Sequence, residues 1–278
     1  MDKTALKNLL RQHNLHPNKL MGQNFLVDRN VLEKIIQAAD LQPNDTVLEI
    51  GSGLGTLTKE LAQRAKKVIT VEKDKNLVLI LRQELINFKN VKIIQGDILK
   101  IQKLKTSAFA KTSADKKNYK IIANIPYYLT SHLIKRFLKS KTPPQEMTLM
   151  VQKEVGQRIC AKPPKTNLLA VTVQFYAQPQ IVSYVSRASF LPQPKVDSAI
   201  IKISDIQKPK NIDSVKFFKL VKASFSSPRK QLANNLSQKL KIEREEIKAI
   251  LKKNNLNPEI RAEALSMEDW KKLCLSFL

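Results

Sequence analysis

Four short apolar runs in the first half of the chain are each followed at once by residues that can bind a small polar ligand. The first run ends at Ile50 and continues into Gly51, Gly53 and Gly55. The next three lead to Glu72, to Asp97 and to the segment Asn124-Ile125-Pro126-Tyr127. Ligands of doubly wound sheets bind where the parallel strands end, so we expect these four segments to meet in one site.

The glycine-rich turn and Glu72 could hold the two halves of a nucleoside-containing ligand. Glycines let the backbone approach a ligand closely, and the start of the following helix offers free amide groups. The spacing G-x-G-x-G falls short of the full dinucleotide fingerprint. A carboxylate such as Glu72, about 20 residues further on, suits a ribose diol. A solvated acid beside Lys73 is an equal alternative for Glu72.

The two later segments could recognise amino groups of a purine. Asp97 could accept a hydrogen bond from an exocyclic amine, or it could cap the turn that follows it. Pro126 fixes its own φ, so the turn after Asn124 is rigid and its carbonyls point in set directions. The Asn124 side chain and the Pro126 carbonyl could accept the two protons of one amine, while Tyr127 offers a ring for a planar base. Alone, Asn-x-Pro-Tyr is more typical of a simple turn, but its place at a fourth strand end favours a site.

The elements that would position these residues alternate between strand and helix. Apolar, β-branched runs predict strands over 46–50, 67–74, 90–97, 119–123 and 146–155, and helices are expected between them. Asp28 is a candidate N-cap for a helix over 31–39. This order predicts an α/β fold with a mainly parallel, Rossmann-like sheet over residues 1–205, completed by strands over 179–187 and 197–204. Residues 206–278 read as a small all-helical domain, and residues 105–118 as a surface loop.

The charge of the chain points to a polyanionic partner. Lys and Arg number 49 against 24 Asp and Glu, a net charge of +25 that favours nucleic acid over a membrane. Two cysteines and three histidines make no metal set and no disulfide framework. No apolar run approaches the roughly 20 residues of a membrane span. We therefore expect no metal, no membrane association and a reducing cytoplasmic location.

The motifs together resemble a known family. The segment EIGSGLG with Glu72, Asp97 and N-I-P-Y looks like the class I S-adenosylmethionine-dependent methyltransferases that act on adenine N6. Residues 22–26, 150–163, 190–198, 225–236 and 261–273 make the chain similar to the rRNA adenine N6,N6-dimethyltransferases, in particular those of the small subunit. The resemblance runs from about residue 18 to the end and implies a class I sheet whose last strand is antiparallel.

The resemblance assigns a cofactor, S-adenosyl-L-methionine, and the residues around it. The segment that contains Gln23, Asn24 and Leu26 would close over the methionine end of the cofactor. The turn at Gly51 and Gly53 would line the methionine, Glu72 would hold the ribose, and Asp97 would accept from the adenine amine. Asn124 would lie nearest the transferred methyl group.

The resemblance also assigns residues to the target. Asn124 and Pro126 would hold the target amine, Tyr127 would stack on the adenine, and Phe190 would close its other side. A hydrophobic plug between strands is the alternative reading of Phe190. Lys195, Arg229 and Lys230 would contact RNA, although Pro228 stands where the family usually has a first arginine.

The implied activity is the dimethylation of two adjacent adenosines near the 3′ end of 16S rRNA in an immature small ribosomal subunit, by a monomeric enzyme. Two alternatives stay open at this point. One is a methyltransferase of 23S rRNA of the macrolide-resistance type, which shares N-I-P-Y. The other is a non-catalytic nucleic-acid-binding relative.

Overall fold

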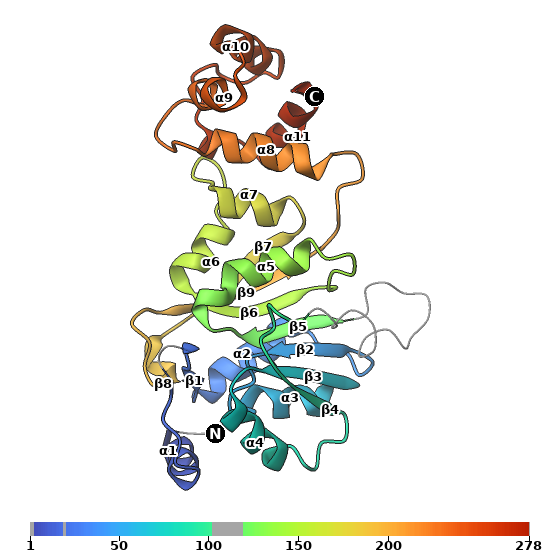
Figure 1. The fold of residues 1–278 in the computed structure, drawn as a ribbon, viewed down its shortest axis with the longest axis vertical. Helices are drawn as coiled ribbons and strands as arrows, with labels where there is room; N and C mark the ends of the chain where they lie inside the picture. The colour runs from blue at the N-terminus through green and yellow to red at the C-terminus, as the bar shows by residue number, and fades with distance from the viewer. Residues whose placement is uncertain (1–2, 19–20, 102–118, 278) are drawn as a thin grey trace. The chain divides into compact units, whose positions relative to one another are not determined.

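The computed structural model describes residues 3–18, 21–101 and 119–277, so the predicted loop over 105–118 lies outside the described residues. The central feature is a seven-stranded sheet in the order β4-β3-β2-β5-β6-β9-β7 (Figure 1). Its strands are β2 (Thr46–Ile50), β3 (Lys67–Glu72), β4 (Val91–Gln95), β5 (Lys120–Asn124), β6 (Met147–Gln152), β7 (Gln178–Val185) and β9 (Ser198–Ser204).

The sheet is parallel from β4 to β6 and then reverses. Strand β2 pairs in parallel with both β3 and β5, and β5 pairs in parallel with β6. Strand β9 runs antiparallel to β6, with Gln152 opposite Ser198. The predicted fold class, a mainly parallel sheet with an antiparallel strand late in the chain, is confirmed. Because β2, β3, β4 and β5 run parallel, their carboxyl ends lie at one edge of the sheet.

Helices lie between these strands and after the last one, as predicted, although the strand expected over 146–155 ends at Gln152, where a helix begins. They are α1 (Lys3–Gln12), α2 (Arg29–Ala39), α3 (Thr56–Arg64), α4 (Lys75–Glu84), α5 (Thr130–Leu138), α6 (Lys153–Ile159), α7 (Leu168–Gln174), α8 (Ser214–Ser224), α9 (Leu232–Leu240), α10 (Arg244–Lys253) and α11 (Met267–Ser276). The predicted N-cap of α2 is confirmed, because the Asp28 carboxylate accepts from the amides of Asn30 and Val31. Among the described helices, none is long and apolar enough to cross a membrane.

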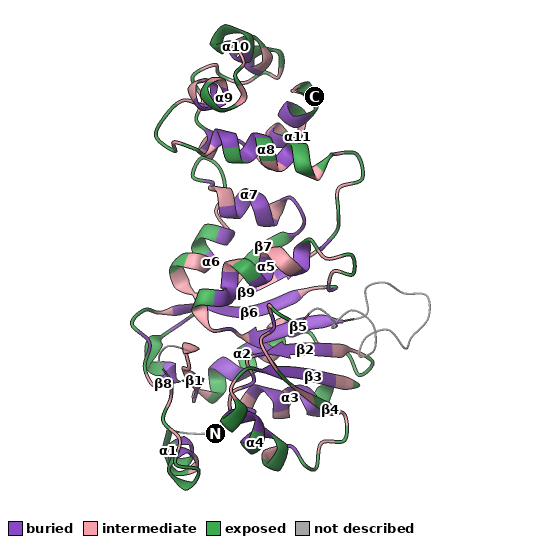
Figure 2. Ribbon diagram, in the orientation of Figure 1, coloured by how far each residue is buried: buried purple, intermediate pink, exposed green. Residues whose placement is uncertain are grey.

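The core lies between the sheet and the helices, where β2, β3, β5, β6 and β9 are mostly buried (Figure 2). One apolar cluster joins α2 and α3 to the face of the sheet that carries Val47, Val68 and Ile122. It also holds the short antiparallel pair β1 (Phe25–Leu26) and β8 (Phe190–Leu191) through Leu26 and Phe190. Packing of this pair carries the segment before α2 back toward the strand ends that the site needs.

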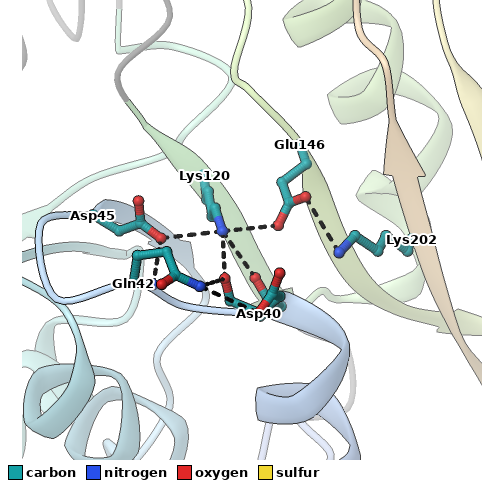
Figure 3. Close-up of polar contacts among 7 residues, drawn as sticks. Asp40, Gln42, Asp45, Lys120, Glu146 and Lys202 are labelled. Carbon is teal, nitrogen blue, oxygen red and sulfur yellow. Dashed lines mark hydrogen bonds and ion pairs between the residues drawn. The ribbon is translucent and has the colours of Figure 1, made fainter.

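A buried cation fixes the opposite edge of the sheet. Lys120, the first residue of β5, is 7% exposed and is surrounded by oxygen atoms (Figure 3). Its ammonium donates to the backbone carbonyls of Ala39 and Asp40 at 3.2 and 2.7 Å, and pairs with Asp45 and Glu146 at 3.1 and 3.2 Å. A buried ammonium needs such a full set of partners, so this cluster ties the end of α2 to β5 and β6.

The contacts of the chain divide it into two compact units. The first comprises residues 1–156 and 179–206, and the second comprises residues 157–178 and 207–278. The predicted division at residue 205 differs from this in one respect. Residues 157–178 belong with the C-terminal helices instead of with residues 1–156. One contact that joins them is the stacking of Phe175 on Phe217 of α8, with ring centroids 4.1 Å apart.

Candidate active site

The four predicted segments converge on one pocket at the carboxyl ends of the strands. Its walls are the N-terminal segment 21–26, the turn and helix start over 49–57, the strand ends at 71–73 and 96–98, and residues 124–129. Strands β2, β3, β4 and β5 each contribute residues at or directly after their carboxyl ends. The shared polarity of β2 to β5 is what gathers residues that lie far apart in the sequence.

Gly51 allows two of these segments to touch. Its φ is +76°, and a Cβ atom added there would lie 3.3 Å from the ring Cδ of Pro126 and 3.7 Å from the carbonyl oxygen of Asn124. Any side chain at this position would be strained in φ and would press on Pro126. At Gly51 the pocket wall is therefore backbone.

Glu72 is held in a fixed orientation by backbone amides. Its Oε2 accepts from the Gly53 amide at 3.0 Å, and its Oε1 accepts from the amides of Lys73 and Asp74 at 2.7 and 2.9 Å. Burial raises the pKa of Glu72, and these three amides oppose that rise. A carboxylate can accept about four hydrogen bonds, so Glu72 keeps acceptor capacity for the predicted ribose contact.

Asp97 caps the turn that follows it, and its contact with an exocyclic amine stays a prediction. Its Oδ1 accepts from the Leu99 amide at 2.9 Å, which caps the turn after β4, and its Oδ2 pairs with Lys73 Nζ at 3.2 Å. Burial raises the pKa of Asp97, but the Leu99 amide and the Lys73 ammonium outweigh it and hold the pKa below its usual value. Asp97 thus lines the pocket as an oriented anion.

The N-terminal segment is tied over the pocket by its side chains. Gln23 Nε2 donates to Asp74 Oδ2 at 2.8 Å, and Asn124 Nδ2 donates to the carbonyl oxygen of Asn24 at 3.3 Å. Asn24 Nδ2 in turn donates to the Gly22 carbonyl at 3.2 Å. Gln23, Asn24 and the buried Leu26 all line the pocket, and their contact with a cofactor stays a prediction.

The Asn-Ile-Pro-Tyr segment forms a rigid turn at the end of β5. The Pro126 carbonyl accepts from the Leu129 amide at 2.9 Å, which starts a short 3-10 turn over Tyr127–Leu129. The Tyr127 hydroxyl shares a 2.7 Å hydrogen bond with Ser198 Oγ. Burial raises the pKa of Tyr127, so the phenol stays neutral. One lone pair of the Pro126 carbonyl is occupied by the turn itself, and the carbonyl has a second lone pair.

Phe190 lies in the apolar core and not among the residues that line the pocket. It is 2% exposed and packs in the apolar cluster opposite Leu26, where β8 pairs with β1. Its ring does not line the pocket as the described residues form it. This position matches the hydrophobic-plug reading, because a side chain buried in the core offers little exposed surface to a base.

The structure adds two polar groups that sequence reasoning had passed over. Glu49 is 1% exposed and lines the pocket, and its Oε2 accepts from the Thr58 hydroxyl at 2.6 Å. Glu49 Oε1 and the buried hydroxyl of Ser52 have no hydrogen-bond partner among the described residues. Burial raises the pKa of Glu49 to about 7, against the hydroxyls of Thr58 and Thr70, which lower it. In the sequence, Glu49 could have been recognised as a charged residue inside an otherwise apolar strand.

Tyr128 is a third residue that lines the pocket and was not expected from the sequence. Its ring is 52% exposed, and it lies beside Gly22, where an added Cβ would be 3.7 Å from the ring. It lines the mouth of the pocket next to Tyr127. In sequence it looked like a continuation of the turn.

The predicted RNA contacts are exposed and are distributed over both units. Lys195 lies in the Pro-rich loop before β9, in the first unit. Arg229 and Lys230 lie in the second unit, in the loop between α8 and α9. The Asn235 side chain braces that loop by donating to the carbonyls of Ser224 and Ser227 at 2.7 and 2.9 Å. Pro228, which replaces an expected arginine, is exposed in the same loop.

Known proteins of the same kind share both the sequence and the fold. Residues 14–276 match the family Ribosomal RNA adenine dimethylase. The chain is 44% identical to a Ribosomal RNA small subunit methyltransferase A of Dehalococcoides mccartyi, over 98% of this chain and 92% of that protein. It is 41% identical to the protein of the same name from Clostridium botulinum, over 96% of each chain.

Two solved structures extend the comparison. A dimethyladenosine transferase from Plasmodium falciparum is 28% identical with a TM-score of 0.75, over 91% of this chain and 97% of the other. The 23S rRNA methyltransferase ErmE is 26% identical with a TM-score of 0.71, over 91% of this chain and 99% of the other. The family match and the two relatives confirm the resemblance indicated by the motifs. The chain belongs to the ribosomal RNA adenine dimethylase family.

Proposed function

We propose that this protein transfers methyl groups from S-adenosyl-L-methionine to N6 of adenosines in small-subunit rRNA. The observation that carries the proposal is the convergence of Gly51, Glu72, Asp97 and Asn124 on one pocket at the strand ends. Two relatives named for the small subunit match at 41% and 44% identity, whereas the 23S enzyme matches at 26%. This difference supports the small-subunit substrate over the 23S alternative.

The pocket fits the cofactor chemically. Glu72 would accept from the ribose hydroxyls, and Asp97 from the adenine amine, because each is an anion held in place by backbone amides. The unpartnered Oε1 of Glu49 would accept from the amino group of the methionine end. Gln23 and Asn24 would close the pocket from above. When bound, the cofactor supplies a methyl group already activated on a sulfonium.

The chain's own contribution at the target is positioning. Asn124 Nδ2 donates to the Asn24 carbonyl, so its Oδ1 remains the acceptor that can face the target amine. With the second lone pair of the Pro126 carbonyl, it would accept both protons of that amine and turn the nitrogen lone pair toward the methyl donor. Tyr127 would stack on the flipped base. A displacement at an activated carbon depends mainly on this alignment of the reacting atoms.

The proposal extends to the setting of the reaction. The basic charge of the chain suits the phosphates of rRNA in an immature small subunit, with Lys195, Arg229 and Lys230 among the contacts. We propose that the protein acts as a monomer in the cytoplasm and adds two methyl groups to each of two adjacent adenosines. The residues 206–278 would then serve as an RNA-binding domain attached to the catalytic residues 1–205.

The experiment is a methylation assay on undermethylated small subunits, followed by mapping of the modified bases. Asn124→Ala should lower turnover by about a hundredfold or more, because an alignment contact is lost. Its cofactor affinity by calorimetry should change little. Asn30→Ala, an exposed asparagine on α2, is the matched control and should leave turnover unchanged. Turnover near that of the wild type in Asn124→Ala would refute the assignment. A parallel assay offers 23S rRNA, and label in 23S rRNA but none in the small subunits would refute the substrate.

A further inference from the structure

A second cluster of RNA-compatible side chains lies on the first unit, outside the pocket. Tyr184 on β7 is 51% exposed, and Val196 in the Pro-rich loop is 45% exposed. Three cations accompany them, namely Lys153 at the start of α6, Arg187 and Lys195. We call these five residues the tyrosine–cation surface. Large apolar side chains at this exposure, interleaved with cations, are typical of surfaces that bind single-stranded nucleic acid.

The contacts within the tyrosine–cation surface show that it is built around one residue. The Lys153 amide donates to the Asp197 carbonyl at 2.9 Å, and the Arg187 amide donates to Asp197 Oδ1 at 3.1 Å. Arg187 Nη1 also lies 3.4 Å from the Lys195 carbonyl. Three segments that are separate in sequence, the start of α6, the turn after β7 and the loop before β9, are thus held together at Asp197.

The same residues connect the surface to the active site. Ser198 follows Asp197 directly, and its hydroxyl is hydrogen-bonded to Tyr127 at 2.7 Å. Lys153 follows β6, the strand next to β5, and the two strands end at the same edge with Asn124 opposite Met150. A strand of RNA that places an adenosine on Tyr127 would pass this surface within a short distance.

The chemistry of the surface suits a base and its flanking phosphates. Lys153 Nζ lies 5.2 Å from the centroid of the Tyr184 ring, a cation–π arrangement that keeps the ammonium beside the aromatic face. None of the ion pairs found among the described residues includes Lys153, Arg187 or Lys195. Asp197 and the exposed Glu154 are the acids nearby in sequence, so the three cations leave a net positive charge.

We propose that the tyrosine–cation surface binds the RNA strand adjoining the target adenosine. A base stacks on Tyr184, and the phosphates beside it contact Lys153, Arg187 and Lys195. This inference rests on the proposed function, because it takes the target adenosine to lie at Tyr127. It assigns a positioning role, in which the surface sets the affinity for RNA and leaves the chemistry at Asn124 unchanged.

The test compares variants of the surface on undermethylated small subunits. Tyr184→Ala should weaken RNA binding and raise KM about tenfold, since stacking of one base is lost. The turnover number at saturating RNA should stay within about twofold of the wild type, and Tyr184→Phe should restore KM, because the ring is what stacks. Unchanged cofactor affinity by calorimetry shows that each variant is folded.

Two charge-reversal variants distinguish contacts made by the tyrosine–cation surface from an effect of net charge alone. Arg187→Glu should weaken binding more than Lys89→Glu, which makes the same change in charge at an exposed position before β4, at the other edge of the sheet. Equal effects of these two variants, or wild-type affinity in Tyr184→Ala, would overturn the inference while the proposed function stands. Wild-type protein that binds small subunits without methylating them would instead overturn the proposed function.

Discussion

The proton on Glu49 should make the first unit lose stability as the pH rises. Glu49 is enclosed on β2, with one oxygen bonded to Thr58 and the other unpartnered among the described residues. Burial raises its pKa from 4.5 to about 7. The native state therefore keeps a proton through a pH range in which the unfolded chain has already released it. The substitution Glu49→Gln removes this titration and keeps an oxygen that can accept from Thr58.

The sign and size of the effect follow from linkage. Stability falls with pH wherever the native state binds more protons than the unfolded state, which for Glu49 is the range from 4.5 to about 7. Each pH unit of that range is worth 1.36 kcal/mol, so the wild type should lose about 3 kcal/mol across it relative to Glu49→Gln. Above about pH 7 the difference in stability between the wild type and Glu49→Gln stays constant. Glu49→Gln should therefore be more stable than the wild type at pH 8, and the two should nearly agree at pH 4.5.

Hydrogen exchange of the β2 and β3 amides, measured without cofactor from pH 5 to pH 8, gives the opening free energy of this unit. After correction for the intrinsic exchange rate, protection of the wild type should fall with pH relative to Glu49→Gln. Glu33→Gln removes an exposed carboxylate of α2 and controls for the change in net charge. Parallel pH profiles for the wild type and Glu49→Gln would refute the reasoning, because they would mean that Glu49 ionises alike in both states.

Three further outcomes are expected. Gly51→Ala should cost about 1–2 kcal/mol of stability and weaken cofactor binding, because a non-glycine residue is strained at φ +76° and its Cβ presses on Pro126; calorimetry with unchanged affinity would contradict this. Lys120→Met should destabilise the first unit by about 3–5 kcal/mol in urea unfolding, since buried partners lose their cation. Turnover by its folded fraction should match the wild type, because Lys120 lies at the opposite end of β5 from Asn124, and a selective loss of turnover would argue against that separation. The logarithm of the affinity for small subunits should fall linearly with the logarithm of the salt concentration, and an affinity indifferent to salt would exclude phosphate contacts as its main source.

Local pattern was enough to predict the framework of the site. The β-branched runs before Gly51, Glu72, Asp97 and Asn124 marked strands, and the parallel polarity of such strands placed their ends together. The N-cap at Asp28 was equally readable, because a cap depends on residues two or three positions away. These features were predictable since their causes lie within a few residues of one another in the sequence.

Other features depend on contacts that the sequence does not encode locally. Phe190 carried a motif but lies in the core, because the pairing of β8 with β1 encloses its ring. Gln23 and its partner Asp74 are 51 residues apart, and only folding brings them together. The segment 157–178 joined the second unit through Phe175, although strand and helix order had placed it with the first.

The sequence by itself therefore determined which residues could do chemistry and the order of the elements that carry them, because hydrophobic period and turn residues act locally. The tertiary structure alone decided how each group is charged and which side chains reach the pocket. Glu49 shows the physical reason most directly. Its identity is written in the sequence, but its pKa is set by burial, and burial is a property of the whole packed unit.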